Sequence, residues 1–110
     1  MNILLKHGTE YREPYVWTAG GSSVDCSGGS LKGEIRAEPN EELLGSFTFT
    51  WIDQKNGQFE AAIEQAAGDA IPDGIFCYDW IFTDSNGRNL PPILAGRITK
   101  EGTITETTAP

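Results

Sequence analysis

Few residues in this chain have the types and spacing that catalysis or metal binding requires. His7 is the only histidine, and the sequence contains neither a Gly-x-Ser-x-Gly nor a His-Glu-x-x-His pattern. These patterns place a nucleophile at a sharp turn or two zinc ligands on one helix face, so their absence argues against both kinds of hydrolase. We interpret His7 as a surface or edge residue and expect no catalytic residue, no metal and no cofactor.

Asp79 is the one carboxylate placed inside an apolar run, between Tyr78 and Trp80. Burying an ionised carboxylate is costly unless hydrogen-bond donors surround it. A pair of carboxylates can perform acid–base catalysis, and a small enzyme with such a site is one hypothesis for this chain. We favour a structural role, in which Asp79 bonds a backbone group or a hydroxyl where strands cross.

The two cysteines, Cys26 and Cys77, allow at most one intramolecular disulfide. Without a secretory signal their default state is reduced, because disulfides persist in oxidising compartments. Free cysteine is among the most buried residue types. We therefore expect both residues to be unpaired and to act as small core side chains.

Residues 53–57 and 84–88 resemble fragments of a calcium-binding loop, which needs oxygen ligands at alternate positions. Both segments lack the later acidic ligands, and their Asn-Gly pairs are typical of tight turns between strands. The glycine-rich segments 20–23 and 27–30 lack the Lys-Ser/Thr pair of a phosphate-binding loop. All four segments are therefore interpreted as turns or loops.

The charge balance excludes some partners. The chain of 110 residues has 16 acidic and 8 basic side chains, a net charge of −8, and an acidic surface repels nucleic-acid phosphates. No segment approaches the roughly 18 apolar residues of a membrane span, and Asn2–Leu5 is too short for a signal peptide. We expect no nucleic-acid partner, no membrane partner and no export.

Alternation of apolar and polar residues predicts a series of short strands, most clearly over residues 30–37, 43–52 and 75–82. Segment 75–82 is mostly apolar on both faces, so we expect a central strand that is mostly buried on both sides. Weaker patterns predict strands over 2–6, 11–17, 58–63 and 93–99. The predicted core consists of Phe47, Phe49, Trp51, Phe76, Tyr78 and Trp80.

The elements together predict an all-β fold. Residues 64–70 are the only helix-prone piece, and Pro72 and Gly74 end it, which leaves one short helical connector. About seven short strands separated by turns indicate an antiparallel β-sandwich that forms one domain over residues 1–110. We expect an N-terminal arm at about 1–8 and a C-terminal tail at about 102–110.

Six short motifs follow one another in a familiar order. They are Thr9–Trp17, Val24–Gly28, Glu34–Arg36, Asn56–Gly57, Pro72–Asp79 and Leu94–Ile98. In this order they resemble a small phage virion domain, the N-terminal domain of the baseplate upper protein family, over roughly residues 9–99. Cys26 stands where that pattern usually has leucine, and Phe76 where it usually has tyrosine.

The resemblance implies an immunoglobulin-like β-sandwich that docks within a virion and has no catalytic residues. The expected function is a non-enzymatic bacteriophage structural protein of the tail, baseplate or fibre attachment, assembled in the host cytoplasm. Its expected partners are other virion proteins and copies of itself in a symmetric assembly. A capsid decoration or cement protein is one alternative, and a surface adhesion or carbohydrate-binding sandwich is another.

Two segments outside the motif region are candidates for assembly contacts. Both carry β-prone residues and no proline, so nothing in them blocks pairing with a neighbouring sheet. We expect them to act as arms that pair with a neighbouring subunit or lie along its surface. The candidate residues are Asn2, Ile3, Leu4, Leu5, Lys6, Thr103, Ile104 and Thr105.

Overall fold

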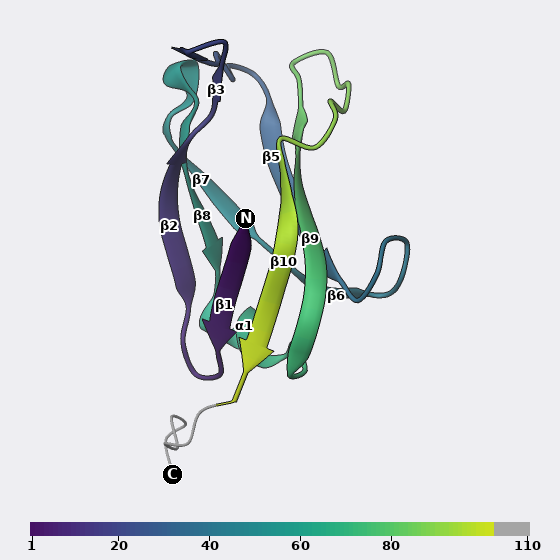
Figure 1. Cartoon of the computed structure of the whole chain (residues 1–110). Coiled ribbons are helices and arrows are strands. Elements are labelled where there is room, and N and C mark those ends of the chain that lie inside the picture. The colour runs from purple at the N-terminus through teal and green to yellow at the C-terminus, as the bar shows by residue number, and fades with distance from the viewer. Residues whose placement is uncertain (103–110) are drawn as a thin grey trace.

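Strands make up most of the chain in the computed structural model, which describes residues 1–102 (Figure 1). The strands are β1 (Asn2–Lys6), β2 (Tyr11–Val16), β3 (Thr18–Ala19), β4 (Ser22–Ser23), β5 (Ser30–Arg36), β6 (Leu43–Ser46), β7 (Thr48–Asp53), β8 (Gln58–Ile63), β9 (Gly74–Thr83) and β10 (Leu94–Glu101). A 3-10 turn covers Gln54–Asn56, and a short helix, α1, covers Gln65–Asp69. The predicted all-β fold and its short helical connector are confirmed.

Two sheets face each other across a shared core (Figure 1). One has five strands in the order β1-β10-β9-β5-β6, the other has three in the order β2-β8-β7, and β3 and β4 form a small separate hairpin. The pairing is antiparallel except that β1 runs parallel to β10. The all-antiparallel prediction is therefore wrong at this edge, where the chain's first strand pairs with its last.

One continuous segment belongs to both sheets, because β6 pairs with β5 while β7 pairs with β8. Phe47 lies between them, and its N–H donates a hydrogen bond to the Gly33 oxygen at 2.9 Å. Strands that change sheets in this way form the corners of sandwich folds. The crossing places Phe47 in the core, where it is 7 % exposed.

The core is built around Trp80 of β9, which is 1 % exposed. The rings of Tyr15, Phe49 and Phe59 meet it edge to face, with centroid distances of 4.9, 5.4 and 5.9 Å. Such arrangements align the positive edge of one ring with the negative face of another. The indole N–H is buried and has no hydrogen-bond partner among the described residues.

The predicted core is correct for some members and incomplete for others. Phe47, Tyr78 and Trp80 are buried, whereas Phe49, Trp51 and Phe76 are partly exposed at its periphery. β9 is the central strand of its sheet, as predicted, but the prediction that it is mostly buried on both faces is wrong, since Ile75 on the outer face is 63 % exposed. No described element covers this face completely, and antiparallel sheets commonly leave one face to water.

A buried lysine fastens α1 to the five-stranded sheet. Lys100 of β10 is 2 % exposed, and its ammonium donates to the carbonyl oxygens of Gly68 at 2.7 Å and Ile71 at 2.8 Å. These carbonyls lie at the C-terminal end of the helix, which favours a cation. The helix backbone also approaches β1 closely, since a Cβ at Gly68 would lie 3.1 Å from Leu5.

Candidate functional site

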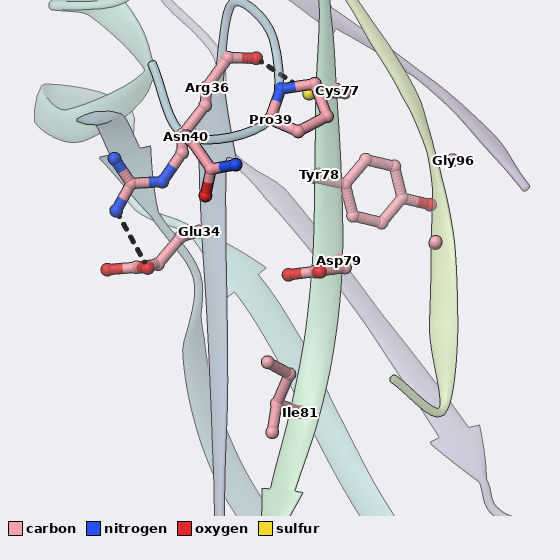
Figure 2. A pocket seen from close by; sticks show the side chains of 10 residues that line it. Glu34, Arg36, Pro39, Asn40, Cys77, Tyr78, Asp79, Ile81 and Gly96 are labelled. Atoms are coloured by element: carbon pink, nitrogen blue, oxygen red, sulfur yellow. Dashed lines mark hydrogen bonds and ion pairs between the residues drawn. The ribbon is translucent and has the colours of Figure 1, made fainter. Parts of the chain in front are cut away.

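A shallow groove of about 650 Å³ crosses the outer face of the five-stranded sheet (Figure 2). The loop between β5 and β6 forms one wall, where Asn40 adopts a left-handed conformation with φ of 66°, which asparagine tolerates. The residues that line the groove are Glu34, Arg36, Pro39, Asn40, Cys77, Tyr78, Asp79, Ile81, Ala95 and Gly96.

The charged groups of this groove mostly hold the sheet and its loop together. Arg36 pairs with Glu34 at 3.1 Å and donates to the Glu41 carbonyl oxygen at 2.5 Å. Glu34 and Asp79 occupy paired positions on β5 and β9, and like charges placed opposite one another are destabilising. Arg36 offsets this repulsion, so the groove is an ion-paired surface.

Asp79 departs from its predicted role. It lies on the outer face of β9, partly exposed, and has no hydrogen bond to any described residue. The prediction that it bonds a backbone group or hydroxyl at a strand crossing is therefore wrong. The outer face is not covered by another layer, so the carboxylate keeps contact with water and needs no protein donor.

The two cysteines occupy different environments, and both are free. Cys26 is 1 % exposed, and burial raises the pKa of its thiol, so its interpretation as a core residue is confirmed. Cys77 is partly exposed in the groove, where its thiol donates to the Arg36 carbonyl oxygen at 3.2 Å, and the core interpretation is wrong for it. Thiol catalysis needs a base beside the sulfur, and no histidine or lysine lines this groove.

His7 lies at the surface, as predicted. Its Nδ1 is 3.5 Å from Oδ1 of Asp69, which also accepts the Gly8 N–H at 2.7 Å. In the described part of the chain, no serine, threonine or cysteine side chain is hydrogen-bonded to His7. The contact ties the β1–β2 connection to the end of α1.

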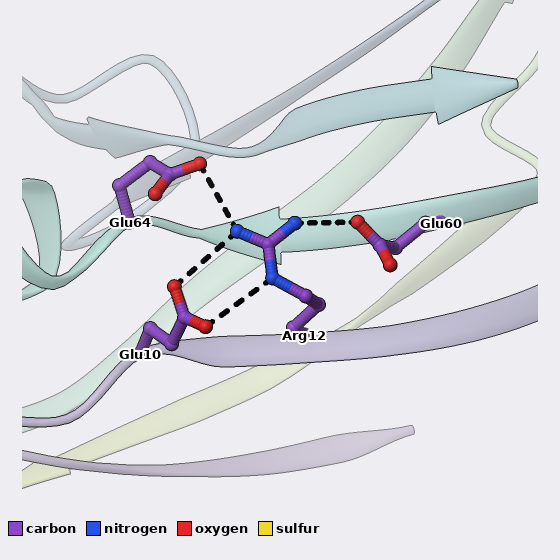
Figure 3. Close-up of polar contacts among 4 residues, drawn as sticks. All are labelled: Glu10, Arg12, Glu60 and Glu64. Atoms are coloured by element: carbon purple, nitrogen blue, oxygen red, sulfur yellow. Dashed lines mark hydrogen bonds and ion pairs between the residues drawn. The ribbon is translucent and has the colours of Figure 1, made fainter.

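The outer side of the three-stranded sheet carries one arginine among three glutamates (Figure 3). Arg12 contacts Glu60 at 2.5 Å, Glu10 at 3.2 Å and Glu64 at 3.4 Å. The hydrogen bond and charge of Arg12 hold the pKa of Glu10 below its ordinary value. The cluster is a surface ion-pair network, and residues 1–102 contain no group of side chains arranged to hold a metal ion.

The two calcium-like segments are turns, as predicted, and β7 with β8 and β9 with β10 form the antiparallel pairs that they connect. Asp84 accepts the backbone N–H groups of Asn86 and Arg88, both at 2.9 Å. The bond from Arg88 is the main reason that the pKa of Asp84 is lowered. Asp53 accepts the side-chain amide of Asn56 at 2.8 Å. These carboxylates close the turns.

An open sheet edge at β1 is the feature with the clearest capacity for binding. The His7 N–H donates to the Glu101 oxygen of β10 at 2.8 Å. Successive strand residues turn their backbone groups to opposite sides, so odd-numbered residues of β1 face β10 and even-numbered ones face away. The residues with outward backbone groups are Asn2, Leu4 and Lys6.

The other sheet edges carry features that hinder pairing. On β2, the Trp17 N–H bonds the Gly57 oxygen at 2.9 Å, which turns even-numbered residues outward and places Pro14, without an N–H, on the open side. β6 has only four residues, and its pairing with β5 contains a register shift. The pairing of β7 with β8 also contains a register shift, near the end of β7. Proline, short strands and register shifts all protect sheet edges. β1 contains no proline and pairs with β10 without a register shift, although it has only five residues.

The predicted assembly residues fall into two groups. Ile3 and Leu5 are 4 % and 2 % exposed and pack in the chain's own core. The predicted strand over residues 2–6 is therefore confirmed, and the expectation of a free N-terminal arm is wrong. Their alternation with Asn2, Leu4 and Lys6 buries two large aliphatic side chains, which fixes β1 to its own sheet. Thr103, Ile104 and Thr105 lie outside the described residues.

Sequence reasoning missed the pairing of β1 with β10 and the buried Lys100. The signal for the first was present in the alternation of Ile3 and Leu5, which marks one face of a strand but not its partner.

No helix within residues 1–102 is long and apolar enough to cross a membrane. Comparison with protein-family models and with curated proteins finds no match to the chain.

Proposed function

We propose that this chain is a non-enzymatic bacteriophage virion protein of the tail, baseplate or fibre attachment. It docks to neighbouring virion proteins through the open edge of β1. The observation that carries the docking mode is Leu4, whose backbone N–H and C=O point away from the sheet and have no partner among the described residues. Such an edge accepts an added strand from another chain.

The motif order in residues 9–99 supports the virion assignment and, with it, an immunoglobulin-like form of the sandwich. The ion pairs support a structural role, because Arg36 in the groove and Arg12 on the other sheet bind neighbouring glutamates or the backbone. The other sheet edges are protected, which directs docking to one place. A capsid cement protein would use the same edge. The position of the protein in the virion, on the tail or on the capsid, distinguishes this alternative from a tail or baseplate component.

A carbohydrate-binding role has less support. Sugar recognition by stacking needs exposed aromatic rings, whereas the exposed large apolar side chains within residues 1–102 are aliphatic or methionine. They are Met1, Leu4, Val16, Leu43, Ile52 and Ile75. All 11 aromatic residues lie in the described part, and each is buried or half-buried.

Leu4→Pro tests the docking edge. The substitution removes an N–H that the chain's own sheet does not use and gives β1 the feature that Pro14 gives β2. In purified virions, quantitative mass spectrometry should find the parent protein at a fixed copy number and Leu4→Pro nearly absent. The purified variant should keep the parent's far-ultraviolet circular dichroism.

Val16→Pro is the matched control, because Val16 also has an outward N–H, lies on the protected edge of β2 and is 56 % exposed, close to the 57 % of Leu4. It should be incorporated normally. Absence of the parent protein from virions would contradict the virion assignment. Normal incorporation of Leu4→Pro would contradict docking through β1.

A further inference from the structure

We infer that the occupant of the β1 edge is a second copy of this chain, paired antiparallel about a two-fold axis that passes through Leu4. The inference rests on the proposed function only in using the same edge. It specifies the partner, the strand direction and the register, none of which the docking proposal requires.

Backbone geometry supports this register. With the axis at Leu4, the outward N–H and C=O of Leu4 face the same groups of Leu4 in the second copy, and the two residues exchange two hydrogen bonds. The outward N–H of Lys6 then faces the C=O of Asn2 in the second copy. The Lys6 oxygen already accepts the N–H and hydroxyl of Thr9, at 3.2 and 2.6 Å, so it does not need the new contact.

The side chains of β1 are also complementary to themselves in this register. Ile3 faces Leu5 of the second copy, which continues the apolar inner face from one sheet to the other. On the outer face, Lys6 lies opposite Asn2, so no like charges are opposed across the seam. The two Leu4 side chains, each 57 % exposed in the single chain, meet at the axis and shield one another.

Symmetry favours a second copy as the partner, and the charge of β1 itself does not oppose one. An axis perpendicular to the sheet keeps both inner faces on the same side, so two five-stranded sheets become one continuous sheet. The chain carries a net charge of −8, which opposes most contacts between copies. β1 has no acidic residue, and its only charged side chain, Lys6, is paired with Glu101 at 2.8 Å.

A charge-swap experiment tests the two-fold register, because a residue on the axis faces itself. Leu4→Lys and Leu4→Glu should each place like charges opposite one another and weaken dimerisation about tenfold or more. An equimolar mixture of the two variants should restore dimers, as heterodimers that weaken as salt is raised. Sedimentation equilibrium over a concentration series measures each association constant. Val16→Lys and Val16→Glu, at a side chain of equal exposure, should leave the parent's dimerisation unchanged.

Three results would overturn the inference. A parent protein that stays monomeric at about several hundred micromolar would exclude a second copy as the occupant. In that case the docking proposal would still stand if Leu4→Pro were absent from virions that contain the parent protein. Dimers that both Leu4 variants form as tightly as the parent would locate the contact elsewhere. Dimers that disappear when residues 103–110 are removed would identify the neighbour's tail as the occupant.

Discussion

Replacing Lys100 with methionine should destabilise the domain by about 2–3 kcal/mol. The Ile71 carbonyl has no other partner in the described residues, and an orphaned buried carbonyl costs roughly 1–3 kcal/mol. The Gly68 carbonyl keeps the Ile71 N–H at 3.1 Å, but α1 loses the cation at its C-terminal end, which adds about 0.3–1 kcal/mol. Methionine fills much the same volume, and removal of a buried ammonium offsets part of the loss.

Urea unfolding followed by tryptophan fluorescence measures this change, with an unchanged m-value showing that the unfolded state is comparable. Lys32→Met is the control, since Lys32 lies on the same sheet with its side chain 73 % exposed and only a 3.7 Å ion pair to Glu34. It should shift stability by less than about 0.5 kcal/mol. If Lys100→Met unfolded at the same urea concentration as Lys32→Met, the assigned role of the buried ammonium would be refuted.

Four further predictions follow from burial. Trp80→Ala should cost about 3–5 kcal/mol in the same assay, and a melting temperature within a degree of the parent would contradict its central place in the core. Burial raises the pKa of Tyr78 to about 12, so folding favours the neutral phenol. The free energy of unfolding should keep its full value below about pH 10 and fall as the pH rises towards 12. A stability that does not change across that range would contradict the burial of this phenol. In the native protein a thiol reagent should label Cys77 before Cys26, which should react only on unfolding, and equal rates would contradict the difference in exposure. Deletion of residues 1–6 should lower the melting temperature strongly, because it removes the buried side chains of Ile3 and Leu5, and an unchanged melting temperature would contradict their place in the core.

Much of the fold could be predicted because strand alternation and turn chemistry are local properties. The Asn-Gly turn at residues 56–57 and the aromatic alternation that ends at Trp51 lie within a few residues of each other, and they defined the β7–β8 hairpin. The pairing of β1 with β10, unlike this hairpin, joins residues that are far apart in the sequence. Asn2 pairs with Arg97 across most of the chain, and a sequence pattern shows which face of a strand is apolar but not which distant strand lies beside it.

Charge and hydrophobicity each misled the sequence analysis at one position. Lys100 shares its strand face with buried Ile98, but lysine is rarely buried, so its place in the core could not be inferred from residue type. Ile75 is apolar and was expected inside, yet it is exposed because hydrophobicity does not reveal whether a layer covers that face. Residues 2–6 could be recognised from the sequence as a β-prone segment, but their attachment to the chain's own sheet required the structure.

The parallel pairing of β1 with β10 also determines when the proposed docking edge can form. During synthesis β1 leaves the ribosome long before β10, so Ile3 and Leu5 have no strand to pair with until nearly all of residues 1–102 have emerged. Closing a contact over such a separation makes folding slow and places this step late. The orientation of the outward Leu4 groups depends on that final pairing. An incompletely synthesised or truncated chain therefore cannot present the edge in its proper geometry, and under the proposed function assembly would check that the domain has been completed.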